Sequence, residues 1–323
     1  MNNFDDKAMR ELLQTGSPAP WKKRGLVFTP NMLGYTHGSH PCAIHFKDNI
    51  FVVAFTCRDE KQRSHVFLSY AIVEHGSLEL TGTPKLAMLP GEAGTFDCDG
   101  VISVCLIRHR DQHYLYYVGW QNLPDGLWIC DTGRAILDVA ELTLSKEFTG
   151  PVLGRNKSNP LFAAGTAFHI TDDVWHTWYN SGVSWKKTGE GWHHRYGIHH
   201  ASSVNGVDWV CDPGMCIPFV DEYEYAFGRP TVYFSDGVYF MWFAHRATVD
   251  IATYRIGLAW SRDGLKWERK DSLAGIDVSP DGWDSEMICY PYVFEHCGSM
   301  YMLYNGNGYG ATGFGLAVLE VAS

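Results

Sequence analysis

The stretches YGIHHASSVNGVDW (196–209) and YRIGLAWSRDGLKW (254–267) follow one pattern, Tyr-x-Ile-x-x-Ala-x-Ser-x-x-Gly-x-x-Trp. Their first residues lie 58 positions apart. A pattern that recurs at a fixed interval is typical of repeat folds, in which each unit buries its apolar face against its neighbours. The interval at which the rest of the chain repeats is therefore the main guide to the fold.

Aromatic, strand-like segments recur along the whole chain. They are IFVVAFTCR (50–58), YLYYVGW (114–120), WHTWYNSG (175–182), YFMWFAHR (239–246) and YMLYNGNG (301–308). Their starts are separated by 64, 61, 64 and 62 residues, so five units nearly account for the 323 residues. Within each unit, short apolar runs are separated by turn residues such as Asp236-Gly237 and Asp263-Gly264.

These features predict an all-β protein, specifically a five-bladed β-propeller, because radially repeated units of four short strands form propeller blades. In this interpretation the repeated pattern covers the third and fourth strands of a blade, and Trp209 and Trp267 pack in the core between blades. The fifth unit ends at GFGLAVLEVAS (313–323) without a fourth strand, and GLVFTP (25–30) precedes the first unit. We therefore expect the N-terminal strand to complete the last blade and close the ring.

The N-terminal segment is expected to be separate from the propeller. Residues 5–14 could form one short helix, which Gly16 and Pro18 would end. The predicted organisation is an arm over residues 1–24 and a single propeller domain over residues 25–323. The arm lacks the apolar core of a secretory signal.

Charge and composition narrow the classes of partner. The net charge is −10 and the pI is about 5.8, so no nucleic-acid partner is expected, because such proteins present a basic face. No stretch approaches the roughly 20 apolar residues that a membrane span needs. The nine cysteines are odd in number and include no CxxC pair. They predict buried free thiols and a reducing, cytoplasmic location.

Acidic residues precede the innermost strands of three units, where the mouth of a propeller channel would lie. They are Asp99, which is the first candidate, and Asp97, Glu224, Asp284 and Glu286. Carboxylates that face each other across a channel suit glycosyl chemistry, in which one protonates the leaving oxygen and another acts as base or nucleophile. The alternative is that these acids accept hydrogen bonds from turn amides.

Basic and amide side chains form a second candidate set, for binding the substrate. It contains His37 and His40 of the first unit, together with Arg58, Arg63, Arg229, Arg246, Arg255, Asn305 and Asn307. The arginines either recognise an anion or form salt bridges, and the asparagines either bind hydroxyls or cap a turn. Neighbouring histidines in WHHRYGIHH (192–200) face opposite sides of a strand, so neither a metal nor another cofactor is predicted.

Over nearly its whole length the chain resembles the five-bladed propeller superfamily of glycoside hydrolase families 43, 32, 68 and 130. It also resembles uncharacterised propeller proteins found among bacterial surface-polysaccharide genes. The resemblance adds Trp185 and Tyr290 to the expected binding residues. The shared stretches are GTFDCDG (94–100), YLYYVGW, WYNSGVSW (178–185), GRP (228–230), GLAWSRDGLKW (257–267), WDSEMICYP (283–291) and YMLYNGNGYGATGFG (301–315).

The resemblance carries specific expectations for the reaction. Enzymes of families 43 and 32 are similar to one another in placing one acid at the start of each of the first three blades. Asp99 or Asp97 matches the second of these acids, but residues 37–40 and 163–165 contain no acid where the other two are expected. Family 130 phosphorylases resemble the chain in another respect. They use one acid and hold phosphate with cationic side chains, which fits a single acid in the second unit together with the Arg and His residues.

The predicted function is that of a carbohydrate-active enzyme. Its substrate is expected to be a small, anionic sugar, phosphorylated or nucleotide-linked, attacked at a glycosidic or anomeric centre. The alternatives are a sugar-modifying enzyme of surface-glycan biosynthesis that cleaves no glycosidic bond, and a non-catalytic sugar-binding propeller. An enzyme should place at least two of the candidate acids within about 10 Å of each other across the pocket, whereas a binding module should show aromatic platforms without such a pair.

Overall fold

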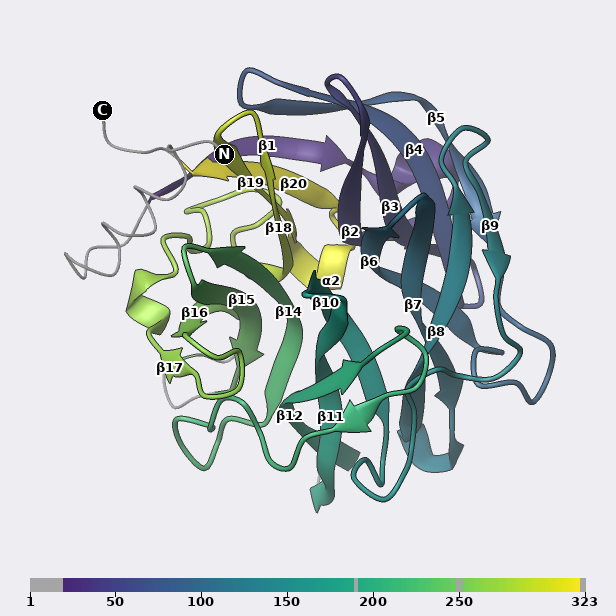
Figure 1. The fold of residues 1–323 in the computed structure, drawn as a ribbon, viewed down its shortest axis with the longest axis vertical. Helices are drawn as coiled ribbons and strands as arrows, with labels where there is room; N and C mark the ends of the chain where they lie inside the picture. The colour runs from purple at the N-terminus through teal and green to yellow at the C-terminus, as the bar shows by residue number, and fades with distance from the viewer. Residues whose placement is uncertain (1–19, 189–190, 248–250, 252, 320–323) are drawn as a thin grey trace.

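A computed structural model describes residues 20–188, 191–247, 251 and 253–319, and these residues form an all-β structure (Figure 1). Antiparallel pairing arranges the strands in consecutive groups around the middle of the molecule. The strands β2, β6, β10, β14 and β18 begin these groups and lie nearest to the centre in Figure 1. The residues at the start of these first strands are therefore placed to form a central site.

The groups follow one another in sequence, and each runs outward from its first strand. One contains β2 (Thr36–Lys47), β3 (Ile50–Arg58), β4 (Ser64–Glu74) and β5 (Ser77–Met88). The next contains β6 (Gly100–His109), β7 (Gln112–Asn122), β8 (Trp128–Asp138) and β9 (Thr143–Lys146). It is followed by β10 (Ala163–Thr171), β11 (Val174–Thr188), β12 (Gly191–Ser203) and β13 (Val210–Cys211). Then come β14 (Ala226–Ser235), β15 (Val238–Arg246), β16 (Arg255–Ser261) and β17 (Glu268–Arg269).

The two ends of the described chain meet in one four-stranded sheet. It contains β18 (Cys289–His296), β19 (Ser299–Asn305), β20 (Phe314–Leu319) and β1 (Trp21–Phe28), in the order β1-β20-β19-β18. The antiparallel pairing of β1 with β20 runs from Trp21 opposite Leu319 to Phe28 opposite Phe314. The expected N-terminal strand is thus present, but it begins at Trp21, inside the segment assigned to the arm. The predicted helix over residues 5–14 lies outside the described residues.

Short helical turns occupy the connections. They are η1 (Pro30–Leu33), η2 (Pro124–Gly126), η3 (Asp271–Leu273) and α2 (Asn307–Gly310).

The aromatic segments found in the sequence are the second strands of their groups: β3, β7, β11, β15 and β19. They are buried because each is paired on both edges and packs against neighbouring groups. Trp21 of β1, for example, contacts Trp242 of β15 edge to face, with ring centres 5.6 Å apart. The core therefore lies largely between groups, as the repeat predicted.

The repeated pattern builds the same turn twice. The hydroxyl of Ser203 accepts a hydrogen bond from the amide of Gly206, and that of Ser261 accepts one from Gly264. The Trp that ends each copy lies just before β13 or β17. Trp267 is buried in one hydrophobic cluster of the core. Trp209 is partly buried and packs against another cluster, so both tryptophans have the predicted packing role.

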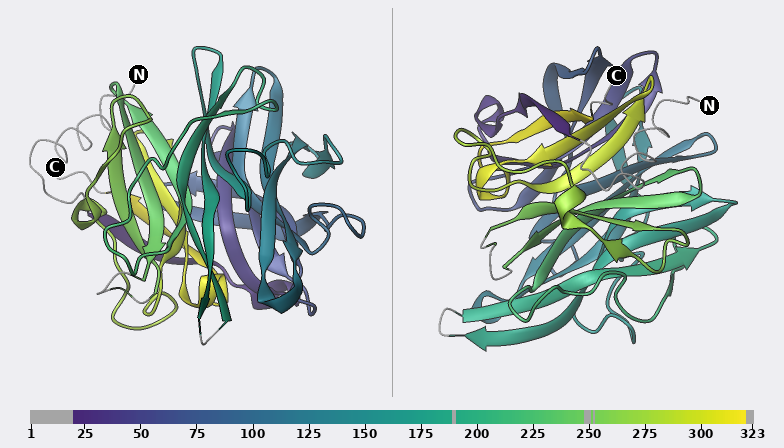
Figure 2. Two further views of the ribbon diagram at one scale, coloured as in Figure 1. Left: turned by 90° about the horizontal axis from the view of Figure 1, so that it is seen from below. Right: turned by 90° about the vertical axis from the view of Figure 1, so that its left-hand side faces the viewer.

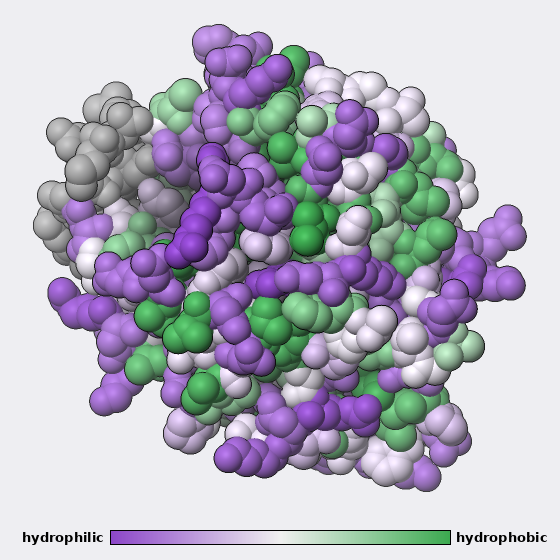
Figure 3. Space-filling model, turned by 45° about the vertical axis from the view of Figure 1, so that its right-hand side comes forward, coloured by the Kyte–Doolittle hydropathy of each residue, from purple (hydrophilic) through white to green (hydrophobic). Residues whose placement is uncertain are grey.

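Small apolar groups are scattered among hydrophilic side chains on the face drawn in Figure 3. Within the described ranges, no helix is long and apolar enough to cross a membrane. All nine cysteines are free thiols, as expected, and six of them are buried. Cys98 and Cys211 are partly buried and Cys297 is exposed.

Candidate functional site

A cavity of about 340 Å³ lies where the first strands of the groups converge. We call it the central cavity. Its wall includes His40 of β2, Arg229 of β14, Tyr290 of β18 and Thr166 of β10. The other lining residues are Arg58, Ile102, Val104, Val118, Trp120, Trp128, Cys130, Phe162, Ala164, Asn180, His194, Tyr196, Gly228, Arg246, Tyr254 and Tyr309.

Backbone irregularities aim three of these side chains at the cavity. The pairing register shifts between Ser39 and Cys42 in β2, and shifts again in β14 and β18 around Arg229 and Tyr290. His40, Arg229 and Tyr290 have φ values of 51°, 31° and 55°. Side chains other than glycine rarely adopt this left-handed region, and such strain concentrates at functional sites. The bulges therefore mark the central cavity as the candidate site.

Two arginines give the cavity its positive charge. Among the described residues, the Arg58 guanidinium has neither a hydrogen bond nor an ion pair, and burial lowers its pKa. Arg246 donates to the hydroxyl of Tyr309 at 2.6 Å and to that of Tyr225. Its Nε is buried without a hydrogen-bond partner. Neither guanidinium is neutralised by a carboxylate in the described structure, so the cavity is suited to an anion.

Arg229 has a different role, although it also lines the cavity. It is 2% exposed, and its guanidinium donates to the backbone carbonyls of Pro41, Val104 and Tyr290 at 2.8, 2.9 and 3.0 Å. These carbonyls belong to three different first strands, β2, β6 and β18. Arg229 therefore holds the strands together around the central cavity.

The two cavity histidines are neutral near pH 7. Burial and the charge of Arg246 lower the pKa of His194 to about 3, and burial with Arg229 and Arg58 holds that of His40 well below its usual value. The His40 ring stacks on Tyr290, with centres 4.1 Å apart, and its backbone amide donates to Asn305 Oδ1. The burial and the cations that keep these imidazoles neutral also make them weak bases, so their role in the cavity is to hydrogen-bond a ligand.

Aromatic rings form the remaining wall. The hydroxyls of Tyr196 and Tyr254 hydrogen-bond to each other at 2.5 Å, and Trp120 stacks on Trp128 at 5.3 Å. Tyr196 and Tyr254 are the first residues of the two repeated patterns, so equivalent positions of two units meet in the cavity. No site role was predicted for these two tyrosines from the sequence, although their identical place in the repeat was the available signal.

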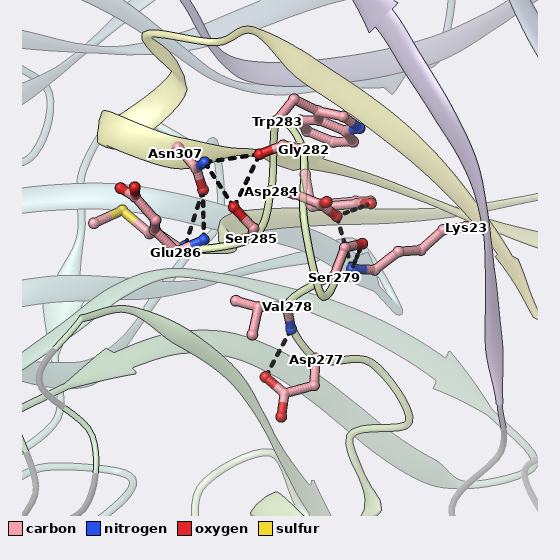
Figure 4. Close-up of polar contacts among 12 residues, drawn as sticks. Lys23, Asp277, Val278, Ser279, Gly282, Trp283, Asp284, Ser285, Glu286 and Asn307 are labelled. Atoms are coloured by element: carbon pink, nitrogen blue, oxygen red, sulfur yellow. Dashed lines mark hydrogen bonds and ion pairs between the residues drawn. The ribbon is translucent and has the colours of Figure 1, made fainter.

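None of the five candidate acids lines the central cavity, and the described lining residues include no Asp or Glu. Three of the acids are nearly fully buried and each pairs with a cation on the outermost strand of its own group. Asp97 contacts Lys146 of β9 at 2.6 Å, Glu224 contacts Arg269 of β17 at 2.7 Å, and Asp284 contacts Lys23 of β1 at 2.7 Å (Figure 4). The expected arrangement of carboxylates facing one another across the channel is therefore not found.

The pair with Arg269 holds the Glu224 carboxyl in its charged form. Burial alone would raise the pKa of Glu224, but hydrogen bonds from Arg269 and His245 outweigh it and lower the pKa to about 2. A carboxyl that stays ionised at all ordinary pH values cannot donate a proton. The structure thus supports a stabilising role for Glu224, in which it ties the segment before β14 to β17.

The other two acids are more exposed. Asp99 lies beside cavity residue Trp120, but its carboxylate accepts a hydrogen bond from the Asn122 amide at 2.7 Å. Glu286 is exposed, and Asn307 fixes its backbone by accepting from its amide at 2.8 Å (Figure 4). Asn307 therefore has the turn-capping contact that was the alternative interpretation, whereas the Asp99 carboxylate is bonded to a backbone amide at the end of β7.

The remaining candidates lie around or away from the cavity. Arg63 pairs with Asp59 at 2.8 Å and Arg255 with Asp277 at 3.1 Å, so these two arginines form salt bridges. Asn305 positions His40, as described above. His37 is half-buried, and burial together with Arg58 lowers its pKa to about 4. Trp185 packs against Trp128 and His194, behind the lining residues.

We predict that Asp97→Asn lowers the free energy of unfolding by about 2–4 kcal/mol, because it breaks a buried, charge-assisted contact with Lys146. Asp99→Asn should change it by less than about 1 kcal/mol, because asparagine keeps an oxygen that can accept from Asn122. Urea unfolding of both variants measures the difference. Equal losses would show that the two carboxylates do not have the separate roles described here.

Comparisons with known proteins agree with this architecture. No protein-family model matches the chain. A solved structure titled "Glycoside hydrolase" superposes with a TM-score of 0.74 at 15% identity, covering 100% of this chain and 97% of that one. A thermostable family-43 glycoside hydrolase gives a TM-score of 0.63 at 16% identity, covering 92% and 90%. An N-acetylgalactosamine deacetylase from F. plautii, in complex with blood group B trisaccharide, gives 0.61 at 12% identity, covering 94% of each chain.

At such low identities these matches show a shared fold of the glycoside hydrolase type and leave the reaction open. A closer relationship in sequence exists with the uncharacterized proteins Rv1502 and MT1551 of Mycobacterium tuberculosis. Each is 36% identical over 305 residues, which are 93% of this chain and 99% of the relative. The chain therefore belongs to the family of these mycobacterial proteins, and it shares the fold of glycoside hydrolases.

Proposed function

We propose that this protein is a carbohydrate-active enzyme that binds an anionic sugar in the central cavity. The observation that supports this most is the charge of the wall. The guanidinium groups of Arg58 and Arg246 face the cavity, and no carboxylate lines it within the described residues. In a protein of net charge −10, an uncompensated positive cavity favours a phosphate or another anionic group.

The aromatic wall supports a sugar as the ligand. Tyr and Trp rings offer flat apolar faces together with polar edges, which match the faces and hydroxyls of a sugar ring. A cavity of about 340 Å³ lies within the usual range for small-molecule sites. The glycoside-hydrolase-like fold is consistent with this class of ligand.

We further propose that the antiparallel groups are the blades of a five-bladed propeller, which β1 closes by pairing with β20. The 61- to 64-residue repeat and the register of β1 against β20 support this proposal. The closed ring would bring the five first strands together and so create the central cavity.

His40 is the residue that we propose for hydrogen-bonding and orienting the ligand. Its ring is neutral, lies in the cavity and is fixed by Tyr290 and Asn305. The aromatic wall without a carboxylate among the described lining residues favours two other candidate functions, modification of a sugar without glycosidic cleavage and non-catalytic sugar binding. A fold neighbour that is a deacetylase illustrates such chemistry on a similar scaffold.

The test is a thermal-shift screen of sugar 1-phosphates against the matching free sugars. The phosphates should raise the melting temperature and the free sugars should not, because binding to the folded state alone stabilises it. Arg58→Gln should weaken phosphate binding by about tenfold or more, since it removes a charged donor. Arg63→Gln is the matched control, because Arg63 pairs with Asp59 outside the cavity.

Equal shifts for phosphates and free sugars would contradict the proposed anion specificity. Unchanged affinity of the Arg58→Gln variant for the sugar phosphates would show that the anion does not bind in the central cavity.

A further inference from the structure

The hairpin formed by β11 and β12 is longer than its neighbours and extends past them (Figure 2). Ser184 lies opposite Arg195 and Lys186 opposite His193, while Trp185 lies opposite His194. Successive residues of a strand point to opposite faces. One face of the extension therefore carries Ser184, Lys186, His193 and Arg195, and the other carries Trp185 and His194.

A second cavity, of about 590 Å³, adjoins the first of these faces. Its opposite wall is the segment that leads into β14, with Glu222, Tyr223 and Tyr225. We call this cavity the hairpin groove. It is lined by Ser184, Lys186, His193, His194, Arg195, Glu222, Tyr223 and Tyr225.

The hairpin groove contains cations that lack acidic partners. Neither Lys186 nor Arg195 forms an ion pair with another residue in the described ranges. Arg195 lies over the ring of Phe219 at 4.2 Å, and its Nε is buried without a hydrogen-bond partner. Glu222 contributes one carboxylate on the opposite wall, so two permanent cations face one anion. The excess positive charge suits a negatively charged group.

The hairpin groove and the central cavity are adjacent. His194 lines both. Tyr225 lines the hairpin groove, and its hydroxyl accepts a hydrogen bond from Arg246, which lines the central cavity. The two cavities therefore adjoin at His194 and Tyr225, at the edge of β12.

We infer that the hairpin groove is a second subsite and that the ligand is a nucleoside-diphosphate sugar. This inference rests on the proposed function, because it places the sugar in the central cavity. The nucleotide half lies in the groove, where Lys186 and Arg195 bind phosphate oxygens. The ring of Tyr223, 60% exposed, offers a face on which the base stacks.

The experiment compares sugar 1-phosphates with the nucleoside-diphosphate sugars that contain the same sugar, using the full chain and titration calorimetry. The double variant Lys186→Gln/Arg195→Gln should weaken binding of the nucleotide sugars by about tenfold or more. Its affinity for the sugar 1-phosphates should change by less than about twofold, because these ligands end before the groove. Tyr223→Ala should likewise weaken the binding of the nucleotide sugars and leave that of the sugar 1-phosphates nearly unchanged.

Lys187→Gln is the matched control. Lys187 is adjacent to Lys186 in sequence, and its replacement removes one positive charge where the double variant removes two, but it lies over Trp192 and lines neither cavity. It should bind both ligand classes as the unaltered chain does. An equal loss in Lys187→Gln would assign the effect to long-range charge and overturn the subsite.

The outcomes separate the two proposals. If sugar 1-phosphates bind through Arg58 while nucleotide sugars are indifferent to Lys186, Arg195 and Tyr223, the subsite is overturned and the proposed function stands. If nothing in either ligand class binds the unaltered chain, the proposed function fails and the subsite fails with it.

Discussion

Arg229→Met should lower the free energy of unfolding by about 3–5 kcal/mol, because three buried carbonyls lose their donor at once. The carbonyls are those of Pro41, Val104 and Tyr290, which belong to three different strands around the central cavity. Methionine fills similar space but donates no hydrogen bond. Equilibrium unfolding in urea measures the loss. The slope of the unfolding free energy against urea concentration should be the same in the variant and the unaltered chain.

Arg262→Met provides the comparison for this variant. Arg262 is exposed and contacts the ring of Trp260. Its replacement should change stability by about 0.5 kcal/mol or less, as is usual for surface positions. If the two variants were equally stable, Arg229 would not have the architectural role that its three hydrogen bonds indicate.

Removal of residues 1–28, which deletes β1, should make the protein aggregate when it is expressed. The deletion leaves β20 as an unpaired edge, and exposed strand edges pair with other chains. It also removes Phe28, whose ring lies 4.5 Å from that of Phe55, and Lys23, the partner of buried Asp284. Size-exclusion chromatography with light scattering distinguishes aggregates from monomer.

A deletion of residues 1–19 retains β1 and is the control for this experiment. Trp21→Ala and Phe28→Ala provide a graded version, and each should cost about 3–5 kcal/mol, the usual range for losing a large buried aromatic side chain. A soluble, monomeric and cooperatively folded protein without residues 1–28 would contradict the proposal that β1 closes the ring.

The strands could be predicted because the signals that specify them are local. The runs at 50–58, 114–120, 175–182 and 239–246 became second strands, as did residues 301–305 of the last run, because aromatic and β-branched residues between turn residues favour strands wherever they occur. The partner strand for the last unit was predicted from a missing element at one end and a spare one at the other. That strand was placed too late at both ends, at 25–30, whereas β1 runs from Trp21 to Phe28.

The candidate acids show where such reasoning stops. Asp97 was correctly placed just before an innermost strand, but its partner Lys146 lies 49 residues later. Asp284 pairs with Lys23, which lies 261 residues earlier. Whether a carboxylate faces a channel or a lysine depends on which distant strand packs beside it, and no local pattern contains that information.

By itself, then, the sequence determined the all-β class, the strand positions and the concentration of arginine and histidine near strand ends. The tertiary structure decided which of these charged side chains remain available to bind a ligand. Arg63 and Arg255 have acidic partners and Arg229 is satisfied by carbonyls, whereas Arg58 faces the central cavity without a partner among the described residues. The physical reason is that the neighbours of a buried charge in space determine whether it is paired. Those neighbours come from strands that are far apart in the chain.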